Sequence, residues 1–256
     1  MPTSVKLQEK FGDDIQVIFV ECQNTSKDVY EAFAWKMRWM GNAAMWTAER
    51  PLSTTGTGLP ETALIGVDGS VIMQGNPGNF GKKLEEAVNA EVKKAKSAPA
   101  GTSKELEHAW KSFLKGDIDD AIAECDKLAS DDAKAAREAF VGRVTARLAR
   151  VKWMTENGYI VAADKEVAAL ESAVKSNPEL SAKVAEKKAL LAAADLADER
   201  EADKAFTAFI SKVAKEKPFD SPTVKKAESL ANKHKDTKTA ARIERFVALS
   251  KVELNK

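Results

Sequence analysis

The feature that most constrains the fold is a β-hairpin predicted within residues 58–73. Thr62–Val67 form a short, mostly apolar run directly after Pro60, and a proline is tolerated there because the start of a strand can lack a ladder hydrogen bond. Asp68-Gly69 is a strong two-residue turn signal, since both positions can take positive φ. Val71–Met73 then supply the return strand. The first third of the chain is therefore predicted to contain β-structure.

The elements predicted around this hairpin alternate between helix and strand. Pro2–Lys10 has a small apolar edge typical of a helix, and Ile15–Val20 is the β-branched, apolar run of a buried strand. Thr25 followed by Asp28 indicates a capping box that opens a second helix. Phe80–Lys96 carries apolar residues at helical spacing. The predicted order is helix, strand, helix, hairpin, helix.

This order resembles the thiol–disulfide oxidoreductase branch of the thioredoxin-like superfamily, whose members are mostly extracytoplasmic. Pro2, Leu7 and Phe11 match the Pro-x-x-x-x-Leu-x-x-x-Phe phrase that ends the family's CxxC-bearing helix. The resemblance implies an α/β thioredoxin-like domain with a cis bond between Leu59 and Pro60. It also implies β-strand addition by a partner peptide at the segment before the proline. The implied partner-binding residues are Thr57, Gly58, Leu59 and Pro60.

The family's first strand and its CxxC are not present in this chain. In the family that strand is central, between the counterparts of Ile15–Val20 and Thr62–Gly66. Its removal leaves rows of unpaired backbone groups, and each buried unsatisfied group costs about 1–3 kcal/mol. We therefore expect that the natural protein starts earlier, that the sheet is rearranged, or that another chain completes it.

A change in composition at Lys96–Thr102 marks a predicted domain boundary. Small residues with proline and glycine make 97–102 a short linker between a domain at 1–96 and another at 103–256. Alanine, lysine and glutamate dominate beyond it, which predicts an all-α domain of seven or eight helices. The predicted N-caps are Thr102, Ser130, Asn177 and Ser221.

Two segments of this helical half resemble each other. Lys115–Ile122 and Asn157–Ala163 share a glycine, an aliphatic or aromatic residue two positions on, and alanines. They resemble the core of tetratricopeptide repeats, but Gly116 and Gly158 are 42 residues apart instead of about 34. The array is therefore degenerate, or an α-hairpin array of tetratricopeptide type, and such arrays offer a concave binding face. Cys125, within the first segment, is expected to be a buried structural thiol.

Composition excludes several classes of function. The formal net charge is +1, so no global field favours nucleic acid. No apolar run reaches about 18 residues, so no membrane insertion is expected, and the first residues lack the apolar core of a signal peptide. An extracytoplasmic location would follow from the resemblance if the natural N-terminus is longer. The two cysteines and two histidines are isolated, so we predict no metal site and no cofactor.

Three functions compete on these residues. Cys22 is a possible redox residue, but it has no neighbouring cysteine, so no catalytic dithiol exists in this chain and no catalytic residue is assigned. We expect a non-catalytic module that binds a protein or peptide, paired with a helical-repeat scaffold. The alternative is an active thiol–disulfide oxidoreductase whose CxxC lies upstream of Met1. A glutathione-transferase-like enzyme is the third, but Asp68-Gly69 is not followed by the Glu/Gln-Ser pair of that family.

Overall fold

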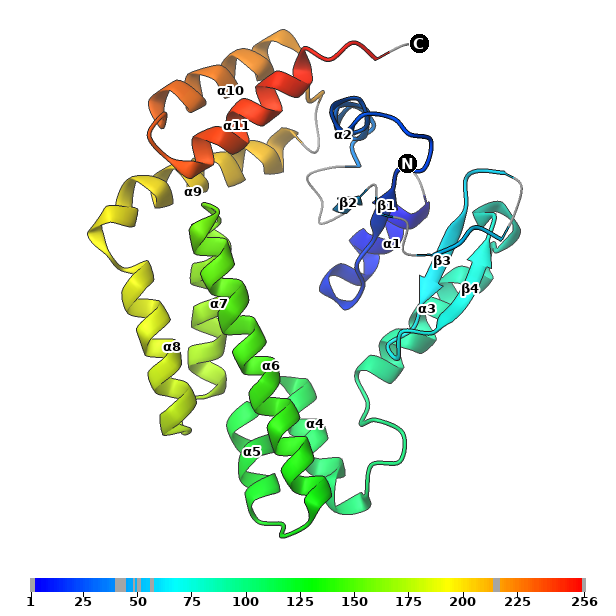
Figure 1. Cartoon of the computed structure of the whole chain (residues 1–256), viewed down its shortest axis with the longest axis vertical. Coiled ribbons are helices and arrows are strands. Elements are labelled where there is room, and N and C mark those ends of the chain that lie inside the picture. The colour runs from blue at the N-terminus through cyan, green and yellow to red at the C-terminus, as the bar shows by residue number, and fades with distance from the viewer. Residues whose placement is uncertain are drawn as a thin grey trace. The chain divides into compact units, whose positions relative to one another are not determined.

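A computed structural model describes residues 3–39, 45–47, 49, 52–55, 58–213 and 217–254. The chain divides into two compact units (Figure 1). Unit 1 comprises Met1–Pro99 with Ala214–Pro218 and Lys251–Lys256, and unit 2 comprises Ala100–Val213 with Phe219–Ser250. All described strands belong to unit 1.

Unit 1 follows the predicted order of elements and adds one strand that was not predicted. Its helices are α1 (Thr3–Phe11), α2 (Lys27–Lys36) and α3 (Lys82–Ala95), with 3-10 turns at Gly12–Asp14 and Pro77–Asn79. Its strands are β1 (Ile18–Val20), β2 (Met45–Thr47), β3 (Thr62–Ile65) and β4 (Val71–Gly75). The unpredicted strand is β2.

The four strands form two separate two-stranded sheets in the described part of unit 1. β1 and β2 are parallel, with Ile18 opposite Met45. β3 and β4 are antiparallel, with Leu64 opposite Met73 and an irregularity before Ile65. No ladder among the described residues joins β1 to β3.

The hairpin is confirmed, but its turn differs from the prediction. Gly69 N–H donates to the Gly66 carbonyl at 3.0 Å, and Gly66 N–H donates to the Ser70 carbonyl at 2.8 Å. Only Gly69 has positive φ, at +81°, so Asp68 does not adopt the left-handed conformation predicted for it. The connection is therefore a three-residue loop with glycine at its left-handed position, one of the common hairpin types.

A small apolar core joins α1, the hairpin and α3. Leu7, Leu84 and Val88 are buried together, and Leu64 and Met73 pack on them from the hairpin. Because side chains alternate along a strand, this places Ala63 and Ile65 on the opposite face of the hairpin, and the irregularity in β4 brings Val71 opposite Ile65. One face of the hairpin is thus covered by helices of its own unit.

Two predictions for β1 and α2 are wrong. β1 is not a buried strand: Ile18 is 51% exposed, since β1 has only β2 as its neighbour in the described sheet. The N-cap of α2 is Ser26 and not Thr25, because the Ser26 hydroxyl accepts from Val29 N–H, as the geometry of a helix start requires. The stacking of Trp39 on Phe19, at 4.9 Å, covers part of β1.

Unit 2 is helical throughout its described residues, and the predicted number of helices is confirmed there. The eight α-helices are α4 (Glu107–Lys115), α5 (Ile118–Asp126), α6 (Asp131–Glu156), α7 (Ile160–Ala173), α8 (Pro178–Leu191), α9 (Ala197–Val213), α10 (Ser221–Lys233) and α11 (Lys238–Ser250). Short 3-10 turns precede α4 and α9, at Lys104–Leu106 and Ala194–Leu196.

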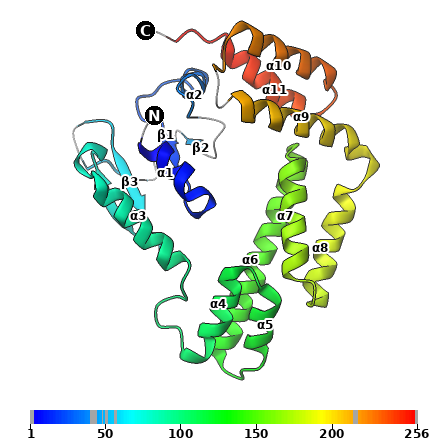
Figure 2. The ribbon, with the colours of Figure 1, turned by 180° about the vertical axis from the view of Figure 1, so that it is seen from behind.

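The long helix α6 organises the first part of unit 2. Its buried residues recur every three or four positions, which gives it a continuous apolar stripe. Neighbouring helices pack along this stripe, and Cys125 is buried among them as predicted (Figure 1 and Figure 2). The stripe consists of Ala133, Ala136, Phe140, Val144, Leu148, Val151 and Met154.

Two of the four predicted N-caps in this half are confirmed. Ser130 and Asn177 each accept a backbone N–H three residues on. Ser221 is instead the first residue of α10, because the Asp220 carboxylate accepts from Thr223 N–H and is the cap. Thr102 is not a cap either, since the first 3-10 turn begins after Ser103.

The hairpin is also tied to α3 by a polar contact. Glu91 Oε2 accepts from Val67 N–H at 3.2 Å, and Glu91 Oε1 pairs with Lys94. The Lys94 hydrogen bond, followed by the Val67 N–H, lowers the pKa of the Glu91 carboxyl. A methyl group on Gly66 would lie 2.8 Å from Glu91 Oε2, so glycine leaves room for this carboxylate.

We predict that acid releases this contact. A folded-state pKa below the unfolded value of about 4.3 means that the carboxylate stabilises the folded state above that pH. The stabilisation is lost as the pH falls through the lowered folded-state pKa. Hydrogen exchange at the Val67 amide should therefore accelerate below about pH 4, and Glu91→Gln should abolish this pH dependence. An unchanged pH profile in Glu91→Gln would contradict the prediction.

Candidate functional site

The segment predicted to bind a partner lies on the surface of unit 1, directly before β3. Gly58, Leu59 and Pro60 are all exposed, and the Leu59–Pro60 bond is cis, as predicted. Thr57, the fourth predicted residue, lies outside the described residues. Leu59 exposes 48% of its surface.

A carboxylate fixes the chain on both sides of this segment. Glu61 Oε1 accepts from Thr55 N–H at 2.8 Å and from the Gln74 amide at 2.7 Å. The same Gln74 amide donates to the Ser53 carbonyl at 2.6 Å. Gln74 belongs to β4, so residues 53–55 and the start of β3 are held against the hairpin. Hydrogen bonds therefore hold the chain in place on both sides of the exposed segment.

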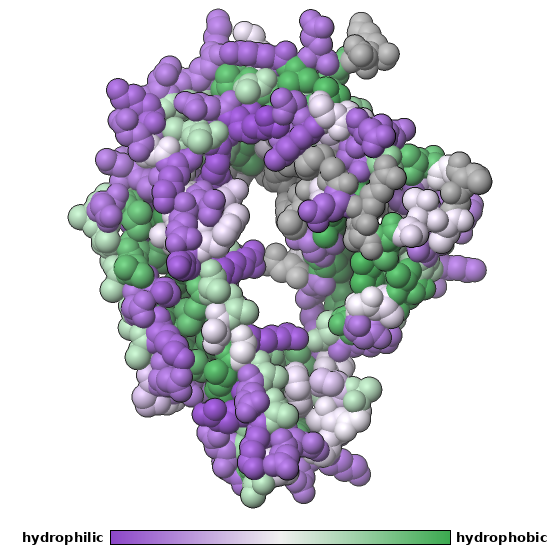
Figure 3. All heavy atoms as spheres, in the orientation of Figure 1, coloured by the Kyte–Doolittle hydropathy of each residue, from purple (hydrophilic) through white to green (hydrophobic). Residues whose placement is uncertain are grey.

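Exposed apolar side chains continue from this segment along the hairpin. Ile65 and Val71, on the face away from α3, are 50% and 44% exposed. Val67 in the turn is 58% exposed. Apolar atoms gather over the hairpin in the space-filling view (Figure 3). The solvent-facing side of an antiparallel sheet usually carries polar residues at such positions. This face of the hairpin is apolar instead, as a buried sheet face would be.

The edge of β3 carries backbone groups that point away from β4. Because Gly66 N–H donates to the Ser70 carbonyl, directly before β4, alternation directs the backbone groups of Thr62 and Leu64 toward β4 as well. The N–H and C=O groups of Ala63 and Ile65 then point to the opposite edge, where no described strand pairs with them. Such an edge is a template for an added strand.

The structure places Cys22 away from this edge, immediately after β1 in the other strand pair. Cys22 is half-buried, and Tyr30 is its neighbour on α2. Burial, then the charges of Glu21 and Cys22, raise the pKa of Tyr30 to about 12, so its phenol stays protonated at neutral pH. Cys125 belongs to unit 2, where burial raises the pKa of its thiol. Both cysteines are present as thiols, not as a disulfide.

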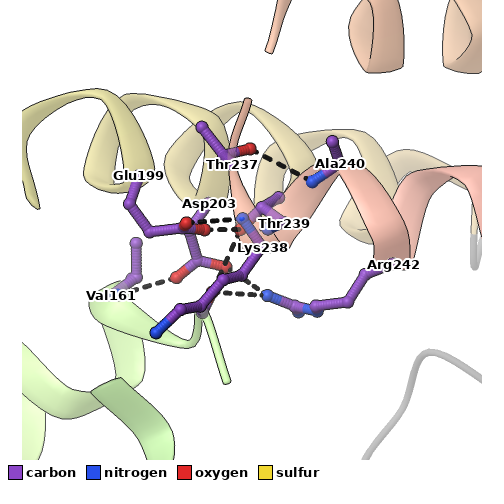
Figure 4. Close-up of polar contacts among 9 residues, drawn as sticks. Val161, Glu199, Asp203, Thr237, Lys238, Thr239, Ala240 and Arg242 are labelled. Carbon is purple, nitrogen blue, oxygen red and sulfur yellow. Dashed lines mark hydrogen bonds and ion pairs between the residues drawn. The ribbon is translucent and has the colours of Figure 1, made fainter. Parts of the chain in front are cut away.

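Unit 2 contains a buried carboxylate cluster that the sequence analysis missed (Figure 4). Glu199 and Asp203 lie one turn apart on α9 and are 7% and 2% exposed. Glu199 accepts from Lys238 N–H at 2.7 Å and from Thr239 N–H at 2.8 Å, at the start of α11. Asp203 accepts from Val161 N–H, in the first turn of α7, at 2.8 Å.

Arg242 completes the cluster from α11. Its Nη1 donates to Asp203 Oδ1 and to the Gly158 carbonyl, at 2.8 and 2.7 Å, and its guanidinium lies 3.7 Å from the centre of the Tyr159 ring. The carboxylates are thus used to satisfy helix starts, so the cluster is structural. The signal in the sequence was an i,i+4 acidic pair beside Ala202 and Phe206, within the apolar stripe of α9.

The described residues include no group of three or more histidine, cysteine, aspartate or glutamate side chains arranged to hold a metal ion.

None of the helices that the structure describes combines the length and apolar character needed to cross a membrane.

Comparison with known protein families, with curated proteins and with solved structures gives no match to this chain. We therefore infer the function from the chemistry of the surfaces and side-chain clusters of the structure itself.

We predict that Gly158→Ala destabilises the protein far more than Gly116→Ala. Both glycines have positive φ, +74° and +92°, which costs a non-glycine residue about 1–2 kcal/mol. A methyl group at 158 would also lie 2.7 Å from Glu199 Oε1 and 3.2 Å from Thr239 N, whereas nothing lies within 4 Å at 116. Displacing a buried carboxylate from its donors adds about 1–3 kcal/mol or more.

Urea unfolding of the two variants measures this difference. Gly116→Ala is the matched control, because it shares the backbone strain and lacks the clash. Equal losses of stability in the two variants would show that the carboxylate cluster does not depend on Gly158.

Proposed function

We propose that this chain is a protein-binding module of thioredoxin-like ancestry, paired with a helical-repeat scaffold, and that its partner adds an extended strand at the hairpin. The observation that carries the proposal is the open edge of β3, which continues the exposed segment Gly58–Pro60. Backbone groups at such an edge supply affinity, and alternate side-chain contacts supply specificity.

The arrangement of the strands supports the thioredoxin-like ancestry. β1 pairs with β2 and β3 pairs with β4, with no ladder between β1 and β3 in the described part of the chain. This is where the family has the central strand that the sequence lacks. The exposed Ile18 and Ile65 are consistent with strands suited to a more extensive sheet.

The arrangement of the helices supports the helical-repeat scaffold. α4 with α5, and α6 with α7, are successive antiparallel pairs, and each pair has a left-handed glycine at the turn, Gly116 and Gly158. The alanines of α5 and α7, Ala121 and Ala163, are fully buried where the helices approach closely. Helix pairs that stack in this way are typical of tetratricopeptide-type arrays.

We predict that an extended peptide binds through its backbone at β3. The probe is a fluorescent seven-residue peptide of alternating threonine and valine, titrated against the full chain by anisotropy. Binding should protect the Ala63 and Ile65 amides from hydrogen exchange more than it changes Thr62 and Leu64, because only the former point outward. Methylating the peptide nitrogens that face β3 should abolish binding, whereas methylating the alternate nitrogens should not.

A side-chain variant tests the contribution of the segment before the strand. Leu59→Ser should weaken peptide binding about fivefold, since part of an apolar side chain is no longer buried by the peptide. Leu190→Ser is the matched control, because Leu190 is similarly exposed, at 53%, but lies on α8 of unit 2. Equal binding by both methylated peptides, or no effect of Leu59→Ser, would contradict the proposal.

We also predict that this chain does not catalyse dithiol reduction of insulin. A single thiol can form a mixed disulfide, but a second thiolate is needed to release the product. Cys22 and Cys125 belong to different units, and Cys125 is buried. An insulin turbidity assay should give the background rate, and Cys125→Ser should give the same rate. Turnover that disappears in Cys22→Ser would overturn this prediction.

A further inference from the structure

A cavity of about 360 Å³ opens in unit 2 where α4 ends and α5 begins, against the middle of α6. We call it the basic cavity. Its volume is within the range of small-molecule sites, about 300–1,000 Å³. Its lining includes Phe113, Lys115, Ile118, Arg143, Val144 and Arg147.

The floor of the basic cavity is apolar and rigid. Ile118 and Val144 are buried members of the core of unit 2. Phe113 stacks on the fully buried Phe140, with ring centres 4.3 Å apart and an interplanar angle of 15°. Because this stacking holds the partly exposed Phe113 ring in place, a ligand's apolar group would meet a preformed surface there, which reduces the entropy lost on binding.

The rim of the basic cavity carries an excess of positive charge. Arg143 and Arg147 lie one turn apart on α6, and like charges at this spacing repel each other. Arg147 Nε donates to Glu166 at 2.6 Å, which holds this side chain in place and neutralises one charge. Lys115 and Arg143 form no hydrogen bond or ion pair with the described residues, and no carboxylate lines the cavity.

Arg143 is nevertheless held near the cavity. Its guanidinium carbon lies 5.7 Å from the centre of the Phe113 ring, within the range of a cation–π contact. Such a contact orients the guanidinium while leaving its N–H groups unused. A planar guanidinium in this state is suited to paired hydrogen bonds with a carboxylate or phosphate.

We propose that the basic cavity binds an organic anion. Its carboxylate or phosphate is held by Lys115, Arg143 and Arg147, and its apolar group lies against the partly exposed ring of Phe113. The site belongs to the helical unit and is independent of the strand-addition function proposed for the hairpin. Loss of either activity therefore leaves the other unchanged.

Calorimetric titration of the full chain tests the chemistry. Phenyl phosphate and phenylacetate are the two anionic probes, and the tighter of the two identifies the preferred anion. Inorganic phosphate should bind at least about tenfold more weakly than phenyl phosphate because it lacks the apolar group. Benzyl alcohol, which lacks the charge, should not bind. Equal affinities for benzyl alcohol and the anions, or no binding by either anion, would overturn the proposal.

Matched variants on one helix locate the site. Arg143→Gln should weaken binding of the preferred anion about tenfold, the value expected when a charged hydrogen-bond partner is removed. Arg150→Gln is the control, because Arg150 is an exposed arginine of α6 that does not line the cavity. Lys115→Gln provides a second variant on another helix. Amide shifts at Gly116 on titration should be lost in Arg143→Gln, and equal affinities for the two arginine variants would refute the assignment.

Discussion

The fold of the helical unit depends on two buried carboxylates of one helix. Glu199 and Asp203 of α9 accept hydrogen bonds from the first turns of α11 and α7, and Arg242 supplies the opposite charge. Buried charges are costly unless they are paired and hydrogen-bonded. Here the donors are helix starts, whose N–H groups have no partner in their own helix and whose dipoles favour negative charge. One cluster thus fixes the position of three helices.

The two units differ in how completely their apolar surfaces are buried. In unit 2 the apolar stripe of α6 is covered along its length, and the buried carboxylates Glu199 and Asp203 have hydrogen-bond partners. In unit 1 the hairpin is covered by helices on one face, while Ile65, Val67 and Val71 stay exposed on the other face and in the turn. A surface of this composition, bordered by an open strand edge, is suited to a protein partner. We therefore propose different chemistry for the two units: backbone pairing in one, and recognition of an anion in the other.

Local sequence patterns predicted helices, caps and turns correctly where a single residue decides the backbone conformation. The hairpin, the eight helices, the Ser130 and Asn177 caps and the burial of Cys125 follow from short-range rules. The errors in caps and turns are at positions where neighbouring residues compete for one role, whereas the exposure of β1 and the strand β2 depend on tertiary packing. Asp220 and Ser221 can both cap a helix, and a turn containing Asp68-Gly69 can have two or three residues. The choice depends on how the following helix or strand packs, which a local pattern does not contain.

The sequence by itself indicated that a region with strands precedes a long helical region, because β-branched apolar runs and a turn signal give way to sequence rich in alanine, lysine and glutamate. A family resemblance also suggested the segment Gly58–Pro60, which the structure shows to be exposed, as a candidate contact. Only the tertiary structure decided that Glu199 and Asp203 face helix starts some 40 residues away along the chain, and that Lys115, Arg143 and Arg147 surround one cavity. These groups come together because separate helices pack against each other. Their spacing in the sequence does not indicate that they are close in space.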